Sequence, residues 1–251
     1  MWWPNTAGGS ATNPPSRMRS NCDAGTGGTS SRGSIPSARM TRADGWLMAA
    51  PMAAPMAYLY LIRHPATQPD PSIPASQWWL SKAGRDEVHA LLGLPIWKHI
   101  STVYTSTQPK AAVVGELVNL TFQIPFMALD ALDEARRDRW LDAEAFDAAQ
   151  RAFFAHPQIP PVRGWESASG AALRFIAALD HLLMVHKPGD SLALVSHATI
   201  LTLYAAHLRE VAPTIEQWRR VSFASIMTVE RAALRPVTPF LTAPYNHLPV
   251  P

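Results

Sequence analysis

Two short apolar segments constrain the fold of this 251-residue chain more than any other feature. Residues 58–62 read YLYLI and residues 192–195 read LALV, so every position is aliphatic or aromatic. Runs of this kind are typical of strands buried on both faces of a sheet, as in α/β proteins. Each run then ends on a pair of polar residues that such a strand cannot pack, Arg63-His64 and Ser196-His197. Either these pairs mark where the strands reach water, or they belong to a site.

Strands and helices alternate along the chain from residue 57 onwards. This alternation predicts an α/β fold, a three-layer α/β/α sandwich with a mostly parallel central sheet. Parallel strands end at the same edge of a sheet, where open α/β sheets bind ligands, so His64 and His197 are expected close together. The predicted strands are residues 57–63, 100–106, 126–129, 191–196 and 224–230, and the predicted helices are residues 81–92, a segment starting near 109, 142–155, 169–185 and 199–208.

Composition divides the chain into three parts. Residues 1–56 are rich in Gly, Ser, Thr and Pro, which favours a disordered or irregular extension because such a segment buries little surface. Residues 57–235 form the predicted domain, and the Pro-rich residues 236–251 are expected to be an extended tail. Several methionines near the start leave open which of them begins translation. Cys22 is the only cysteine, so an intrachain disulfide and a thiolate metal site are excluded.

Charge and hydropathy give no support for a nucleic-acid or a membrane partner. A formal net charge of +3, with no basic stripe interleaved with aromatic residues, gives no support for a nucleic-acid partner. The apolar residues 46–57 are interrupted by Pro51 and Pro55 and are too short to cross a bilayer, so no membrane partner is expected. We expect a cytoplasmic protein, and the oligomeric state stays open.

A lysine near the second predicted strand points to an anion. Lys110 follows Pro109, in the first turn of a predicted helix, where a positive charge opposes the helix dipole. The placement makes sense if the lysine shares the helix N-terminus with a bound anion. Together with Arg63 and the two histidines, Lys110 would form a pocket suited to a phosphoryl group. The alternative is a lysine that points into water.

Several motifs, in order, resemble those of the histidine phosphatase superfamily, which has the phosphoglycerate-mutase-like fold. Arg63-His64-Pro65 stands where this family has Arg-His-Gly, and Thr67 takes the place of its usual threonine. The ordered set is more specific than any one of its members. The other similar segments are LSKAGRDEVHALL (80–92), VYTSTQPKAAVVGELV (103–118), LDEARR (132–137), GWESASGAALRF (164–175) and LVSHATI (194–200).

The resemblance implies roles for individual residues. His64 would be the nucleophile that accepts the phosphoryl group as phosphohistidine. His197 would assist catalysis and bind the phosphoryl oxygens, and the other expected phosphate ligands are Arg63, Lys110 and Thr67. No metal or cofactor is required, and the expected partner is a small phosphorylated substrate.

The general acid is the least specific of these assignments. Glu134 would protonate the leaving oxygen and later activate water. It lies in an acidic stretch, however, where Asp130, Asp133 and Asp138 are competitors and a solvated charged loop is the alternative. Glu166 could substitute for it, or lie on the substrate side.

Three positions depart from the family pattern and bear on activity. Pro65 replaces a glycine and removes an N–H, Ala66 replaces Glu or Gln, and Lys110 keeps a charge but lacks the arginine fork. The preferred function is that of a phosphomonoesterase. The alternatives are a phosphomutase of the phosphoglycerate-mutase type and a catalytically weak protein that binds phosphorylated ligands.

Overall fold

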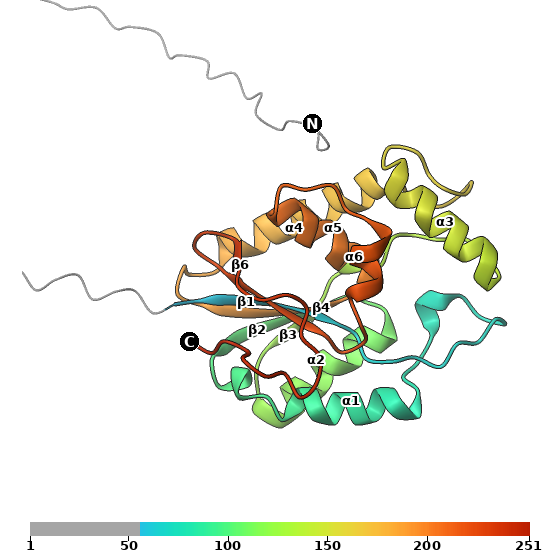
Figure 1. The fold of residues 1–251 in the computed structure, drawn as a ribbon. Helices are drawn as coiled ribbons and strands as arrows, with labels where there is room; N and C mark the ends of the chain where they lie inside the picture. The colour runs from blue at the N-terminus through green and yellow to red at the C-terminus, as the bar shows by residue number, and fades with distance from the viewer. Residues whose placement is uncertain (1–55) are drawn as a thin grey trace, which may run out of the picture. The chain divides into compact units, whose positions relative to one another are not determined.

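A computed structural model describes residues 56–251, and residues 1–55 of the predicted N-terminal extension, with Cys22, lie outside them. Within this part a six-stranded sheet has the strand order β3-β2-β4-β1-β5-β6 (Figure 1). The strands are β1 (Tyr58–Arg63), β2 (Ile100–Thr105), β3 (Phe126–Ala128), β4 (Ser191–Ser196), β5 (Ile226–Glu230) and β6 (Arg235–Pro236).

The sheet is mostly parallel, which confirms the predicted fold class. β1 and β4 run parallel at its centre, and β2 and β3 continue the parallel part. β5 and β6 are antiparallel to their neighbours, so one side of the sheet is mixed. β4 is buried at every position, as its unbroken apolar sequence predicts.

Helices cover both faces of the sheet and complete the three layers. In Figure 1, α1 and α2 lie on one face, and α4 and α5 lie on the other. α6 packs against both α3 and α5. The helices are α1 (Lys82–Leu92), α2 (Pro109–Phe122), α3 (Ala143–Ala155), α4 (Ala168–Val185), α5 (Ala198–Leu208) and α6 (Ile215–Arg220).

Side-chain caps explain where several helices begin. Ser81, Asp142 and Ser167 each accept a hydrogen bond from the backbone N–H three residues later, and Thr214 forms a complete capping box. The Thr214 cap starts α6, a six-residue helix that was not predicted because it is too short to show helical periodicity. The 3₁₀ turns η1 (Ala75–Gln77), η2 (Pro95–Lys98) and η3 (Asp130–Leu132) were missed for the same reason.

α4 is a helix of the folded core, although its composition would also suit a membrane span. It has 18 residues with a mean hydropathy of 1.4, and no other described helix passes the same test of length and apolarity. Its residues Phe175, Leu179 and Leu182 are buried, and it packs against α5.

The Pro-rich C-terminal segment is irregular but packs against the domain. Leu241 pairs with Ile226 of β5 through two backbone hydrogen bonds of 2.8 Å. The Tyr245 side chain is buried and donates to the carbonyl of Ala224 at 2.8 Å, and Tyr60 donates to the carbonyl of Pro249 at 2.8 Å. Residues 237–251 therefore cover part of the sheet.

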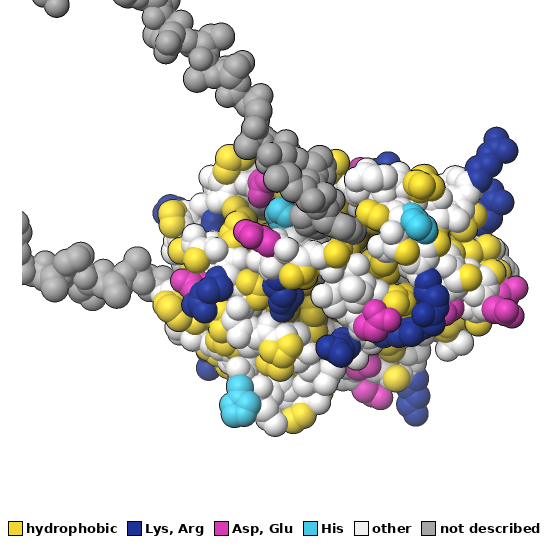
Figure 2. Space-filling model, turned by 45° about the horizontal axis from the view of Figure 1, so that its top comes forward, with side chains coloured by type: hydrophobic (Ala, Val, Ile, Leu, Met, Phe, Trp, Pro, Cys, Tyr) yellow, Lys and Arg dark blue, Asp and Glu magenta, His cyan; other side chains and the backbone are white. Residues whose placement is uncertain are grey.

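Charges of both signs are mixed on the visible surface. On the uncovered part of the face drawn in Figure 2, lysine and arginine side chains are interspersed with aspartate and glutamate.

Candidate active site

The two histidines meet at the carboxyl edge of the central strands. Arg63 of β1 lies opposite Ser196 of β4, so the residues that follow, His64 and His197, leave the sheet side by side. Their rings are 4.9 Å apart between centroids, and both side chains are buried. The parallel register alone is enough to produce this pair.

The protonation of His64 follows from its surroundings. Nδ1 lies 2.8 Å from the carbonyl oxygen of Pro65, and because a carbonyl can only accept, Nδ1 carries the proton. Burial, together with the positive charges of Arg63 and Lys110, holds the pKa of His64 well below its usual value. The ring is therefore neutral, and Nε2 keeps its lone pair.

Contacts with Phe223 and Val221 hold the Arg63 side chain in place. Its guanidinium lies over the ring of Phe223, 3.9 Å from the centroid, and Nη1 donates to the carbonyl of Val221. Nε is buried and has no hydrogen-bond partner within the described chain. Burial lowers the pKa of Arg63 to about 10, against the opposing pull of Glu134 and Glu87, so the group stays charged at neutral pH.

Lys110 points inward, so the alternative of a lysine facing water is wrong. The residue is only 5% exposed, and its Nζ donates to the carbonyl of Ala75 in η1 at 2.5 Å. Burial lowers the pKa of Lys110 to about 8, although the charge of Glu134 acts in the other direction. A buried ammonium with one carbonyl partner is poorly compensated, and an anion would relieve that cost.

Glu134 is the acidic side chain that faces these cations. Its Oε2 accepts the N–H of Thr199, at 3.3 Å, in the first turn of α5, and its Oε1 accepts from Ala135 at 2.9 Å. Its charge raises the pKa of both Arg63 and Lys110, which places it close to them.

The competing carboxylates have other contacts. Asp138 pairs with Arg139 at 3.2 Å on the exposed part of the loop. Glu166 is bound by Arg174 and by the N–H of Arg136, and these bonds outweigh burial and keep its pKa below the usual value. Neither Asp138 nor Glu166 is among the charges that act on the pKa of Arg63 or Lys110, as Glu134 is.

Asp133 supports the second histidine through a serine. Ser106 donates to Oδ1 of Asp133 at 2.6 Å, and Nε2 of His197 lies 2.7 Å from the same hydroxyl. Because the single hydroxyl proton goes to the carboxylate, His197 must be the donor to Ser106. Nδ1 of His197 is then bare, and it is buried without a partner among residues 56–251. Burial and the neighbouring cationic and histidine groups keep the pKa of His197 well below its usual value.

The loop after His64 is tied to α1. The N–H of Ala66 donates to Oε2 of Glu87 at 2.6 Å, and the carbonyl of Ala66 accepts from Ser81 at 3.0 Å. Gly84 permits this approach, because a Cβ there would lie 2.0 Å from that carbonyl oxygen. Thr67 forms an isolated bridge with Leu80. Within the described part of the chain, no hydrogen bond joins the Thr67 hydroxyl to Arg63, Lys110 or either histidine.

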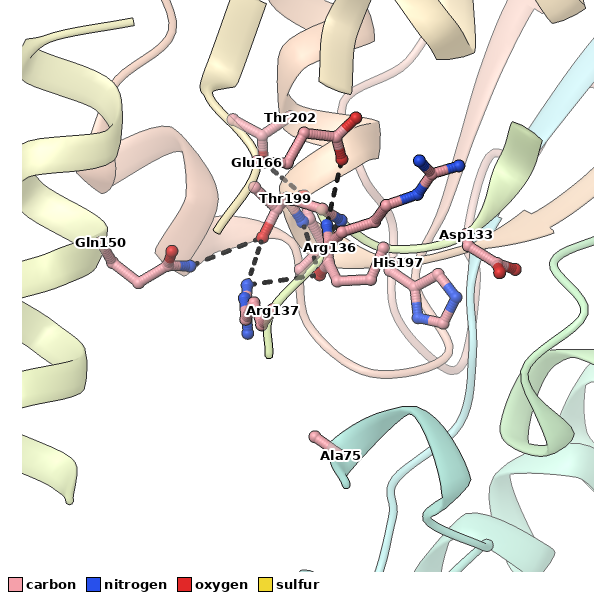
Figure 3. Close-up of polar contacts among 12 residues, drawn as sticks. Ala75, Asp133, Arg136, Arg137, Gln150, Glu166, His197, Thr199 and Thr202 are labelled. Atoms are coloured by element: carbon pink, nitrogen blue, oxygen red, sulfur yellow. Dashed lines mark hydrogen bonds and ion pairs between the residues drawn. The ribbon is translucent and has the colours of Figure 1, made fainter. Parts of the chain in front are cut away.

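Sequence analysis missed Arg137. Its guanidinium lies over the rings of Phe146 and Trp165, at 4.9 Å and 5.2 Å, and donates to Thr199 at 3.2 Å. Figure 3 shows Arg137 and Gln150 approaching Thr199 from different elements, with His197 nearby. Arg137 is 3.9 Å from Oε2 of Glu134, and so adds a cation beside the expected acid. Its position three residues after that acid was the available clue.

A model of the histidine phosphatase superfamily (branch 1) matches residues 59–239. The chain belongs to this superfamily. The match begins one residue into β1 and includes His64, Lys110, Glu134 and His197. No curated protein sequence is significantly similar to the chain.

Solved structures show the same fold at low sequence identity. YhfR of Bacillus stearothermophilus superposes with a TM-score of 0.59 at 20% identity, covering 74% of this chain and 95% of that one. A mycobacterial glucosyl-3-phosphoglycerate phosphatase gives 0.57 at 18%, covering 74% and 99%. A phosphoserine phosphatase variant from Entamoeba histolytica, in complex with phosphoserine, gives 0.58 at 16%, covering 77% and 100%.

The described residues offer no metal centre. Among residues 56–251, no group of three or more His, Cys, Asp or Glu side chains is placed to hold an ion. The polar groups at the sheet edge are instead the cations Arg63 and Lys110, two neutral imidazoles and the carboxylates of Glu134 and Asp133, and the two cations suit an oxyanion.

Proposed function

We propose that this protein is a phosphomonoesterase that acts through a phosphohistidine at His64 on a small phosphorylated substrate. The observation that carries the proposal is the state of His64: a buried, neutral ring whose Nδ1–H is bonded to Pro65, with Arg63 and Lys110 beside it. A neutral imidazole with a free Nε2 is a nucleophile, and two cations attract the phosphoryl group to it.

In the first half of the reaction Nε2 of His64 attacks phosphorus and the ester P–O bond breaks. Arg63 and Lys110 neutralise the phosphoryl oxygens, and the carboxyl group of Glu134 gives its proton to the leaving oxygen. In the second half the Glu134 carboxylate takes a proton from water, the water oxygen attacks phosphorus, and the N–P bond breaks to release phosphate.

Hydrolysis is favoured over phosphoryl transfer to a second hydroxyl. A mutase must exclude water, and the chain between β2 and the Gly164-Trp165-Glu166 segment is short for a covering lid. Two structural neighbours are named as phosphatases, of glucosyl-3-phosphoglycerate and of phosphoserine, which supports hydrolysis of a related class of ester.

Replacement of the nucleophile tests the proposal. His64→Ala should abolish turnover of p-nitrophenyl phosphate and also the acid-labile phosphoenzyme trapped from a labelled substrate. His181→Ala, on the exposed surface of α4, is the matched control and should behave as the wild type. Label that persists in His64→Ala, or that is found on His197 in the wild type, would refute the assignment.

Product analysis separates the alternatives. Incubation with a phosphoglycerate should release inorganic phosphate, whereas a mutase would return an isomeric phosphoglycerate. Tight binding of phosphate without turnover of any ester would instead identify a protein that only binds phosphorylated ligands, as the departures at Pro65, Ala66 and Lys110 would then explain.

A further inference from the structure

Glu134 lies in an irregular loop, so its position needs another source of rigidity. It follows η3 and precedes α3, with no helix or strand between residues 133 and 142. A general acid must lie within hydrogen-bond reach of the leaving oxygen, and a displacement of 1 Å can lower the rate about 100-fold. The backbone hydrogen bonds of this loop therefore matter for the reaction.

Arg174 of α4 binds the loop with its whole guanidinium. Nη1 donates to the carbonyls of Ala131 at 2.9 Å and Asp133 at 3.1 Å, and Nη2 donates to the carbonyl of Glu134 at 3.4 Å. Nη2 and Nε also bond the carboxylate of Glu166 at 2.8 Å and 3.2 Å. All five N–H groups of the arginine thus have acceptors, which the three N–H groups of a lysine could not reproduce.

Glu166 holds the other end of the loop. Its Oε2 accepts the N–H of Arg136 at 3.0 Å, and its own N–H donates to the carbonyl of Arg136 at 2.9 Å. Figure 3 shows the Glu166 carboxylate directed at the backbone of Arg136. The side chains of Arg174 and Glu166 are each 14% exposed, so water competes little for these bonds.

The strand that precedes His197 supplies one more bond. Ser196 donates to the carbonyl of Leu132 at 2.7 Å. The carbonyls of residues 131, 132, 133, 134 and 136 are consequently all bonded to side chains or backbone outside the loop. Glu134 lies within this hydrogen-bonded segment, residues 131–136.

We propose that Arg174 and Glu166 are positioning residues that hold the Glu134 loop so that its carboxyl group reaches the leaving oxygen. The inference rests on the proposed function, since it assumes that Glu134 is the acid. This role does not require either residue to contact the substrate. Their contribution is to the geometry of proton donation alone.

The leaving group provides a selective test. An alkyl phosphate, with a basic leaving oxygen, needs the acid, whereas p-nitrophenolate leaves without it. Arg174→Lys should lower kcat/KM for glycerol phosphate by about 100-fold and leave that for p-nitrophenyl phosphate within about threefold. Glu166→Gln is a milder change and should shift the ratio of the two kcat/KM values in the same direction by about tenfold. This second variant tests the positioning role even if Arg174→Lys does not fold.

Arg231 offers a matched control elsewhere in the fold. It is buried and donates to the carbonyls of Asp190, Leu183 and His186, at 2.6 Å, 3.0 Å and 3.0 Å, and to that of Lys187. Arg231→Lys removes the same kind of backbone clamp from a region without site residues. It should lower the melting temperature and leave the ratio of the two kcat/KM values unchanged.

The outcomes distinguish the inference from the proposed function. Equal losses on both esters in Arg174→Lys and Glu166→Gln, or no loss on either, would refute the positioning role. Glu134→Gln should show the leaving-group selectivity in its strongest form, and Arg174→Lys should add little to it in the double variant. If Glu134→Gln shows no selectivity, the acid assignment itself fails, whatever Arg174 does.

Discussion

At the scale of single residues, the site combines cations that are costly to bury with imidazoles that remain neutral. Within residues 56–251 the Lys110 ammonium has a single hydrogen bond, to Ala75, and burial lowers its pKa to about 8. Arg63 is held from behind by Phe223 and Val221, and remains charged. Of the two cations, Lys110 alone titrates near physiological pH, so it is expected to set the alkaline limit of activity.

We predict that kcat/KM falls as the pH rises through about 8, because a deprotonated Lys110 no longer attracts the phosphoryl oxygens. Lys110→Arg should remove this alkaline limb, since arginine stays protonated. Lys110→Ala should lower kcat/KM by the equivalent of about 2–4 kcal/mol at neutral pH. The exposed Lys98→Ala is the control, and an alkaline limb that survives in Lys110→Arg would contradict the assignment.

At the scale of elements, α1 is joined to the loop after His64 through the backbone of Ala66. Ser81 caps the helix and also donates to the carbonyl of Ala66, two residues after His64. Gly84 lies against the same carbonyl, which explains why a glycine stands in the first turn of a helix, where it is otherwise unfavourable. A shift of α1 would therefore displace the loop after His64 as well.

Gly84→Ala should destabilise the protein by about 1–3 kcal/mol, as expected for overpacking, and also reduce turnover. The added Cβ would lie 2.0 Å from the Ala66 oxygen, so the loop after His64 must shift. Gly93→Ala at the end of the same helix is the control, because its nearest neighbour would be 3.5 Å away. Urea unfolding and steady-state kinetics measure both effects, and a Gly84→Ala protein as stable and active as the wild type would rule out the tight contact.

At the scale of the whole molecule, the buried histidines link folding to pH. The pKa values of His64 and His197 are held well below the usual value by burial and by neighbouring cations, so the native state excludes protons that the unfolded chain binds below about pH 6.5. The stability that these two neutral histidines contribute is therefore fully present above this pH and is lost as the pH falls below it. Carboxylates with a lowered pKa, such as Glu166, change the stability only at more acidic pH.

The free energy of unfolding should therefore decrease between pH 6.5 and 5.5, by about 1 kcal/mol for each of the two histidines. His207, whose pKa burial also lowers, adds a contribution in the same direction. The variant His64→Asn/His197→Asn should show a smaller dependence over this interval. Urea unfolding at the two pH values measures the slope, and an equal slope in variant and wild type would exclude the two histidines as its source.

The sequence by itself determined the sheet, the family and the meeting of the two histidines. Strands buried on both faces have unbroken apolar sequences, and the parallel order then brings the residues after β1 and β4 to one edge. The apolar run and the polar residues that follow it are local in the sequence, so they can be recognised without knowing which strands pair with each other.

Only the tertiary structure decided which polar groups complete the site. Four acidic residues compete between 130 and 138, and Glu134 is distinguished by its bond to Thr199, which is 65 residues away in the sequence. The inward direction of Lys110, the place of Arg137 and the clamp formed by Arg174 likewise depend on contacts between distant segments. An irregular loop has no periodicity that fixes where its side chains point, so their partners become apparent only when the chain is folded.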